Sequence, residues 1–168
     1  QIVTLAPGEW NKTLDAGLTP DCRPVTFDFS GSSATDGCDG NTRTYTDALT
    51  GVSVTASAFS QTKGTNTWQD AWLGAYSGGL GVTDSSEGSG SGNTHTVDNV
   101  GRNNYVVLQF SQSVKLDQAY LGYVVNDSDM KVWIGNSAST ITTMDNSVLS
   151  SMSFSEVNTT TLTTARWA

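Results

Sequence analysis

The sequence predicts an all-β protein, an antiparallel β-sandwich or jelly roll built as a single domain. Short apolar stretches alternate with polar residues at a period of two, and Gly, Ser, Asn and Asp lie between these stretches. Amphipathic helical spacing is scarce. The length of 168 residues suits one domain of ordinary size. Short strands separated by turn residues are typical of sandwiches and jelly rolls.

Six stretches carry strand patterns. The clearest is residues 52–60, where apolar residues alternate with Ser and Thr and so give one apolar and one hydroxyl face. Residues 105–110 are almost wholly apolar, which predicts a central strand buried on both faces. The Gly- and Ser-rich residues 77–93 are expected to form a functional or metal-organised loop. The other predicted strands are residues 25–30, 119–125, 131–134 and 162–167, and a short helix is expected within residues 141–149.

Residues 1–8 are predicted to be a unit separate from the β-sandwich domain of residues 9–168. Ile2, Val3 and Leu5 are apolar and β-prone, and a Pro-Gly pair interrupts the strand soon after them. One interpretation is an ordinary edge strand of the chain's own sheet. The other is a strand donated to a groove on a neighbouring copy, with these three side chains as the assembly contacts. Terminal strands are the easiest elements to exchange between copies.

The charge balance excludes two classes of partner. The net charge of −8 disfavours nucleic acid, and no basic patch favours an anionic lipid surface. No apolar run approaches the twenty or so residues that span a membrane, so membrane insertion is not expected. A chain that begins at Gln1 is typical of a mature form after signal cleavage. We therefore expect a secreted protein, extracellular or at the cell surface.

The two cysteines, Cys22 and Cys38, flank a polar, glycine-containing segment. Zinc is disfavoured because His95 is the only histidine, and neither cysteine lies in a C-x-x-C motif. A disulfide that closes a loop of about 15 residues contributes roughly 3 kcal/mol in the chain-entropy description. This pairing is the predicted one, and it implies an oxidising compartment.

The disulfide prediction can be checked by mass. We expect intact-mass analysis after alkylation to find no free thiol in the native protein and two after reduction. Two alkylated cysteines without reductant would contradict both the disulfide and the inferred compartment.

No stretch carries an enzyme's pattern. His95 has no G-x-S-x-G element to accompany it, and phosphate loops and G-x-G-x-x-G dinucleotide motifs are missing. The acidic residues lie in turn-like segments beside Asn and Gly. That context suits cation binding better than the paired carboxylates of a glycosidase. The sequence therefore predicts a protein that is not an enzyme.

Two acidic turn segments, residues 95–101 and 126–129, directly adjoin predicted strands. Calcium prefers six to eight oxygen ligands, which Asp and Asn at alternating turn positions can supply. The alternative is turn chemistry alone, because Asn and Asp form Asx-turns without any metal. The candidate Ca²⁺ ligands are Asp98, Asn99, Asp127 and Asp129, with further oxygens from Asp84 and Glu87 in the glycine-rich loop.

Several segments together resemble the extracellular domains of exosortase-sorted (PEP-CTERM) bacterial surface proteins. The resemblance covers about residues 79–134, and its most specific piece is the His-x-x-Asp-Asn-x-Gly run. It implies a secreted β-sandwich from a biofilm-forming Gram-negative bacterium. The chain departs from the family at its C-terminal end, where no Pro-Glu-Pro motif follows. The matching pieces are Gly79-Leu80-Gly81-Val82, His95 to Gly101, residues 106–110, Leu121-Gly122 and Asp127-Ser128-Asp129.

Glycan attachment is a further expectation. Asn11 and Asn158 fit the N-x-Ser/Thr acceptor pattern, and Thr159 and Thr160 are candidate O-glycosylation sites. The alternative is chance, because about a quarter of the residues are Ser or Thr, and exposed strands favour Thr.

Two functions from different classes fit these patterns. The first is a calcium-stabilised structural subunit of an extracellular or cell-surface bacterial fibre, which joins copies of itself head to tail by exchanging the N-terminal strand. The alternative is a calcium-dependent carbohydrate-binding module. In that case Trp68, Trp72 and Tyr76 are the candidate platform for stacking a sugar. Core packing is the competing interpretation of these aromatic side chains.

Overall fold

The fold is all-β, as the sequence predicts. The structure is a computed structural model that describes residues 23–32, 39–88, 94–124, 129–157 and 166–167. Within these residues nearly all regular structure is strand, and every strand pair is antiparallel. No helix in this part of the chain is long and apolar enough to cross a membrane.

The largest sheet has four strands arranged around β2 (Ser53–Gln61). One edge of β2 pairs first with β1 (Thr42–Thr46) and then, further along, with β3 (Trp68–Asp70). The opposite edge pairs along its length with β6 (Asn103–Phe110). The alternation in the sequence is preserved here, because Val54, Ala56 and Ala58 of β2 share one buried face.

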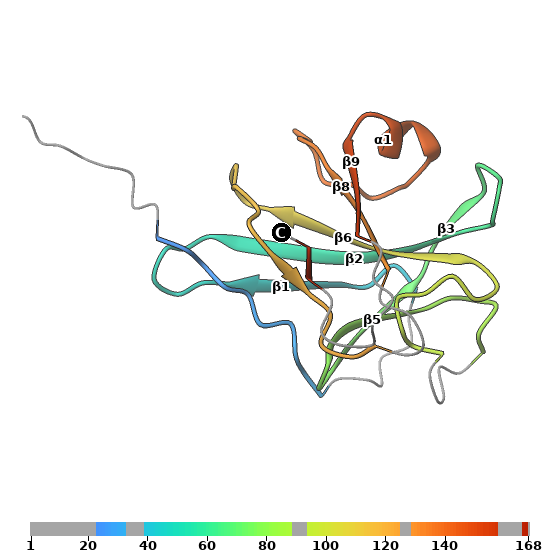
Figure 1. Ribbon diagram of the computed structural model, residues 1–168, viewed down its shortest axis with the longest axis horizontal. Helices are drawn as coiled ribbons and strands as arrows, with labels where there is room; N and C mark the ends of the chain where they lie inside the picture. The colour runs from blue at the N-terminus through green and yellow to red at the C-terminus, as the bar shows by residue number, and fades with distance from the viewer. Residues whose placement is uncertain (1–22, 33–38, 89–93, 125–128, 158–165, 168) are drawn as a thin grey trace, which may run out of the picture.

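Three two-stranded antiparallel sheets accompany this sheet. In Figure 1, β5 lies on one side of the sheet, while β8, β9 and the helix α1 lie on the other. Asp145 caps α1 by accepting a hydrogen bond from the Val148 N–H. The elements are β4 (Trp72–Tyr76) with β5 (Gly79–Thr83), β8 (Met130–Ile134) with β9 (Ser153–Val157), β7 (Ala119–Tyr120) with β10 (Arg166–Trp167), and α1 (Asn146–Ser150).

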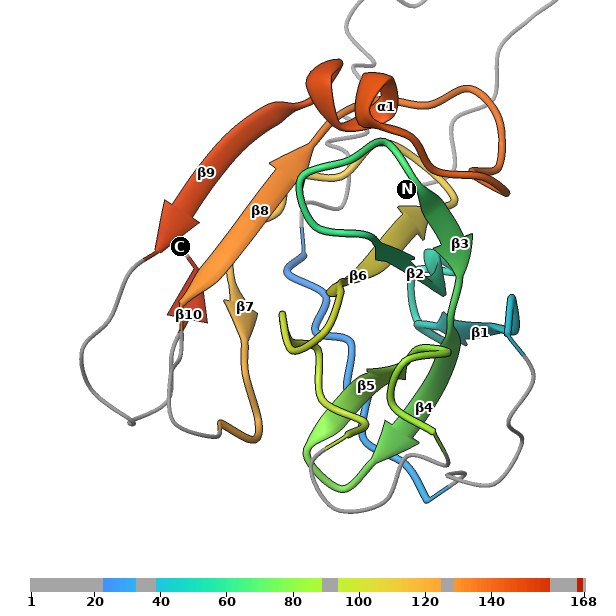
Figure 2. The same ribbon diagram turned by 90° about the vertical axis from the view of Figure 1, so that its right-hand side faces the viewer.

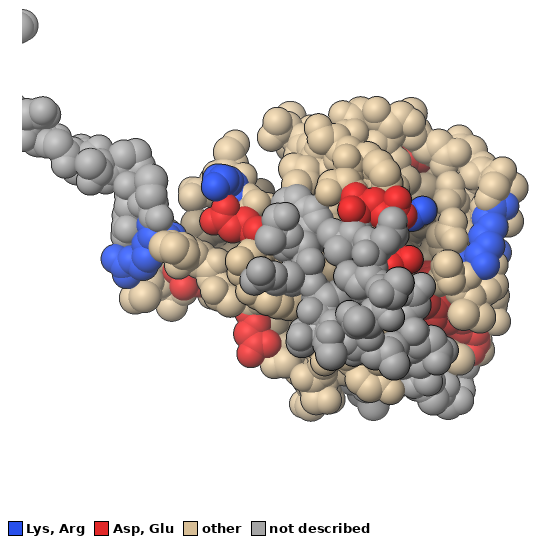
Figure 3. All heavy atoms as spheres, viewed as in Figure 1, with Lys and Arg blue, Asp and Glu red and all other residues tan. Residues whose placement is uncertain are grey.

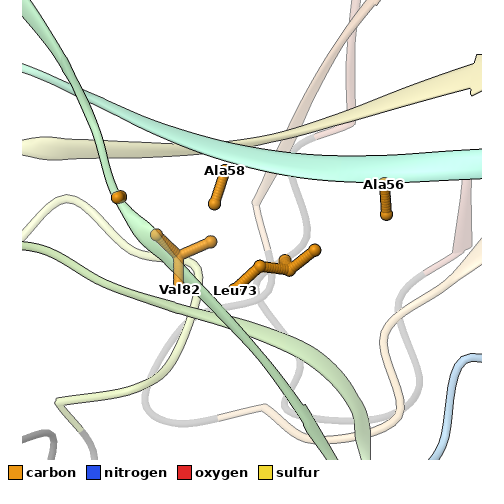
Figure 4. Close-up of a cluster of buried hydrophobic side chains, with 5 residues drawn as sticks. Ala56, Ala58, Leu73 and Val82 are labelled. Atoms are coloured by element: carbon orange, nitrogen blue, oxygen red, sulfur yellow. The ribbon is translucent and has the colours of Figure 1, made fainter. Parts of the chain in front are cut away.

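The core lies between the apolar face of β2 and the β4–β5 hairpin. Ala56 and Ala58 of β2 face Leu73 of β4 and Val82 of β5, and all four side chains are buried (Figure 4). Small residues on one layer and larger ones on the other allow the two layers to approach closely. Val106 of β6 packs against the same cluster from the neighbouring strand.

Part of the expected loop is a strand. Residues 79–83 form β5, whereas the Gly- and Ser-rich composition predicted a loop over the whole of residues 77–93. Gly81 explains the difference, because a Cβ at this position would lie 2.0 Å from the His95 carbonyl oxygen. The glycine that resembles a loop signal therefore permits a close approach between the hairpin and the segment after it.

One predicted strand, residues 25–30, is not formed as a strand, and another is shorter than predicted. Residues 25–30 keep an alternating burial pattern, and Phe27 packs 6.0 Å from Phe110 between ring centroids, but these residues pair with no described strand. Residues 119–125 give only the two-residue strand β7, and residue 125 lies outside the described part. Both stretches partly bury apolar side chains without forming a full set of strand hydrogen bonds. Sequence periodicity reports which side chains are buried and cannot show whether the backbone pairs with another strand.

Candidate functional site

The outer edge of β6 is the first candidate site. The Ser111 N–H donates a hydrogen bond to the Ser53 carbonyl at 2.8 Å. With the register of the two strands, this bond shows that the odd-numbered residues of β6 direct their backbone N–H and C=O groups toward β2. In an antiparallel pair, alternate residues direct both backbone groups away from the partner. The N–H and C=O groups of Val106, Leu108 and Phe110 therefore point outward. Within the described part of the chain, no strand pairs with this edge.

A hollow runs along the same edge. It is lined by all of β6, by residues 119–124 and 129–135 across from it, and by residues 23–32. Figure 2 shows β7 and β8 standing apart from β6 on this side of the molecule. The hollow has a volume of about 3550 Å³, against roughly 300–1,000 Å³ for a small-molecule pocket. The hollow is therefore larger than a small-molecule pocket.

Large apolar side chains that line this hollow are exposed. Leu108 of β6 is 36% exposed although its position is on the core face of the sheet, opposite Ala56. Val114, Tyr120 and Ile134 also line the hollow and are exposed. Exposed apolar side chains of this size are candidates for contact with another chain.

Three of the predicted calcium ligands lie near one another at one end of the sheet. The Glu87 carboxylate accepts the Asp84 N–H at 2.9 Å. Burial raises the pKa of Glu87 above its ordinary value, and the charges of Asp98 and Asp84 raise it further. These residues come from the turn after β5 and the turn before β6. Packing between the two turns, which no local pattern shows, brings them together.

Within the part of the chain that the structure describes, these three residues and the remaining predicted ligands do not form a complete cation site. Asp98 uses its two carboxylate oxygens within its own turn, accepting the Val100 N–H at 2.8 Å and the Thr96 hydroxyl at 2.9 Å. Asn99 and Asp129 are exposed, and acidic side chains on the face in Figure 3 lie in separate groups. Among the described residues, no three or more His, Cys, Asp or Glu side chains are placed to hold a metal ion. Calcium binding at Asp98 and its predicted partners stays a prediction.

A different set of polar atoms stands out at the same end of the sheet. Ser60, Asp84 and Asn104 are buried, and one oxygen of each has no hydrogen-bond partner: Ser60 Oγ, Asp84 Oδ2 and Asn104 Oδ1. Buried side-chain oxygens are normally paired. Two N–H donors, on Trp72 and Arg102, share this property but cannot coordinate a cation. Ser60 and Asn104 were missed by the sequence analysis, although Ser60 places a polar residue where the alternation of residues 52–60 calls for an apolar one.

The three aromatic side chains proposed for sugar stacking do not form one exposed platform. Trp72 is only 7% exposed and contacts Tyr76 edge to face, with ring centroids 6.3 Å apart. Tyr76 in turn lies against His95 at 4.2 Å. Trp68 is in a separate group, 4.8 Å from the Tyr105 ring. These contacts favour the core-packing interpretation that the sequence left open.

Several predicted residues lie outside the part that the structure describes. They are the assembly residues Ile2, Val3 and Leu5, the cysteines Cys22 and Cys38, the calcium candidate Asp127, and the glycosylation candidates Asn11, Asn158, Thr159 and Thr160. Comparison of the chain with protein-family models, curated proteins and solved structures finds no match.

Proposed function

We propose that this protein is a structural subunit of an extracellular or cell-surface fibre, in which copies join head to tail by adding a strand to β6. The supporting observation is the outward-facing edge of β6 beside a hollow lined in part by exposed apolar side chains. Natural edge strands are usually blocked by Lys, Pro, a bulge or a covering segment. The β6 sequence NNYVVLQF contains no charged residue and no Pro. This edge is therefore suited to accept another strand.

The proposed donor is the apolar segment that contains Ile2, Val3 and Leu5. Its backbone would pair with Val106 and Leu108, and its side chains would enter the hollow, as in other strand-addition complexes. Full burial of one such side chain contributes roughly 1.5–3 kcal/mol. Burial of all three side chains therefore offsets only the lower part of the free-energy cost of association, which is roughly 4–15 kcal/mol. Assembly is therefore expected to depend strongly on protein concentration.

The architecture follows from the same proposal. A strand added to β6 would extend the four-stranded sheet toward β7 and β8, and the sheets would then form a sandwich. Because donor and acceptor are different surfaces, the contact is heterologous and propagates as a filament unless it closes into a ring. Secretion, the Cys22–Cys38 disulfide, calcium binding and glycosylation belong to this proposal as properties of an extracellular subunit.

Leu108→Pro is the direct test of strand addition. The Leu108 N–H points away from β2, so proline removes a donor that the sheet does not use, and proline is tolerated at such edge positions. We expect the variant to fold and to need at least tenfold more protein to assemble. Sedimentation velocity and negative-stain microscopy of the full chain measure assembly, and far-ultraviolet circular dichroism measures folding.

Two matched variants separate the backbone from the side chain. Leu108→Ala keeps the N–H and should assemble better than Leu108→Pro. Val107→Pro removes an N–H that faces β2 and should disrupt the sheet itself. Assembly of Leu108→Pro at the wild-type concentration would contradict the proposal, as would a wild-type protein that stays monomeric at high concentration. The carbohydrate-binding alternative would then take first place.

A further inference from the structure

We infer that Ser60, Asp84 and Asn104 form a buried binding site for a calcium ion. It takes Asp84 from the predicted ligand set but uses none of Asp98, Asn99, Asp127 and Asp129, and it does not depend on strand exchange. It rests on three oxygens that are buried without partners at one end of the core face of the sheet.

The register places Ser60 and Asn104 side by side. They are directly opposite each other on β2 and β6, two positions beyond the Ala58–Val106 pair. Ala58 and Val106 both contribute to the hydrophobic core. Because side chains alternate along a strand, Ser60 and Asn104 lie on this same core-facing side.

Asp84 approaches from the opposite layer. It follows Val82, a core residue of β5, by two positions, so its side chain is on the side of the hairpin that faces the sheet. Only 2% of Asp84 is exposed. The Ser86 N–H and hydroxyl donate to Asp84 Oδ1 at 2.7 and 2.6 Å, which leaves Oδ2 for another ligand.

Glu87 connects the two layers of the site. Its Oε2 accepts the Asp84 N–H at 2.9 Å and the Asn104 side-chain N–H at 3.4 Å. The second contact fixes the Asn104 amide with its nitrogen toward Glu87, so that Oδ1 points elsewhere as an acceptor. Ser60, Asp84 and Asn104 thus present a hydroxyl, a carboxylate and an amide oxygen, and Glu87 stands close enough to add another carboxylate oxygen.

The charge of the site favours a cation over a buried water molecule. Asp84 and Glu87 are adjacent carboxylates, and within the described residues no Lys, Arg or His forms an ion pair with either. A water molecule would satisfy the hydrogen bonds but would leave a buried negative charge uncompensated, which is costly. A divalent cation with a preference for oxygen ligands meets both requirements, and calcium tolerates irregular coordination.

The test compares Asp84→Asn with wild type, both as the full chain, in EGTA and in excess CaCl₂. Asp84→Asn keeps the shape of the side chain and removes its charge. In EGTA we expect it to melt at or above the wild-type temperature, because a buried charge is gone. In CaCl₂ we expect wild type to melt higher, and calorimetric titration to show at least tenfold weaker calcium binding by Asp84→Asn.

Two further variants locate the ion. Asn104→Leu should also weaken calcium binding, whereas Asp129→Asn should bind as wild type does. A wild-type melting temperature that is the same in EGTA and in CaCl₂ would indicate a water molecule only and would overturn the inference. Loss of binding in Asp129→Asn together with retention in Asp84→Asn would also overturn it, by assigning calcium to the exposed turns. None of these outcomes depends on whether the protein forms fibres.

Discussion

Deleting residues 1–5 is expected to give a folded protein that no longer assembles. The deletion removes the proposed donor strand, and the β2–β6 sheet and the core of Leu73 and Val82 involve residues far from it in sequence. Without a donor, the outward backbone groups of β6 have no partner to pair with in a neighbouring copy. Sedimentation velocity should show a monomer at concentrations where the full chain forms filaments.

A peptide with the sequence of residues 1–8 provides the complementary experiment. Added in excess, it should bind the deletion variant with one peptide per chain, because it restores the missing strand without linking two subunits. The same peptide with Val3→Asp should bind at least tenfold more weakly, since it places a charge against apolar side chains. Filaments formed by the deletion variant would contradict the proposal.

The peptide also distinguishes a strand that a chain donates to its neighbour from one that it inserts into its own hollow. Insertion into the same chain would give a wild-type monomer that does not bind the peptide and a deletion variant that does. Donation to a neighbour would give wild-type filaments whose length falls as peptide is added, because the peptide occupies the acceptor edge.

The sequence predicts well what depends on neighbouring residues. The alternation in residues 52–60 predicts β2 almost to its ends, because the period of two is a local property of a half-buried strand. The sequence analysis did not predict β1 and β3. These short strands are stabilised by pairing with β2, and pairing between distant residues leaves no local pattern in the sequence. The β4–β5 hairpin was partly hidden because Gly81 is needed for a close contact with His95, yet glycine usually indicates a loop.

Residue type alone identified only part of the candidate site. Asp84 and Glu87 were predicted as oxygen ligands because of their chemistry, and the structure places them next to each other. Ser60 and Asn104 are ordinary polar residues until the β2–β6 register places them opposite each other on a core face. Strand register over more than forty residues of sequence cannot be obtained from periodicity.

Residues 105–110 form a strand as predicted, but its central position in a sheet is not seen among the described residues. Their apolar composition predicts a central strand, but in the described part of the chain β6 pairs on one edge only. Sequences of central strands are adapted to having a neighbour on each side. The conflict disappears if the second neighbour is a strand from another copy, which is the arrangement that the fibre proposal requires.

Leu73→Ala is expected to lower the free energy of unfolding by about 2–5 kcal/mol. Leu73 is fully buried, and the residues opposite it, Ala56 and Ala58, are too short to fill the space that its side chain would leave. The strand cannot easily move inward either. The Leu73 N–H donates to Asn41 Oδ1 at 2.8 Å, and its carbonyl accepts from Asn41 Nδ2 at 2.9 Å and Arg43 Nε at 3.0 Å.

These hydrogen bonds from the Asn41 and Arg43 side chains to the Leu73 backbone hold β4 in place, so most of the cavity should persist and the loss should lie in the upper half of that range. Urea denaturation of the deletion variant that lacks residues 1–5 measures the change without interference from assembly. Leu49→Ala is the matched control, because Leu49 is 79% exposed and its truncation should change stability by less than about 0.5 kcal/mol. A loss of under 1 kcal/mol at Leu73, with an unchanged dependence on urea, would show that the layer of β4 and β5 is not the core of the fold.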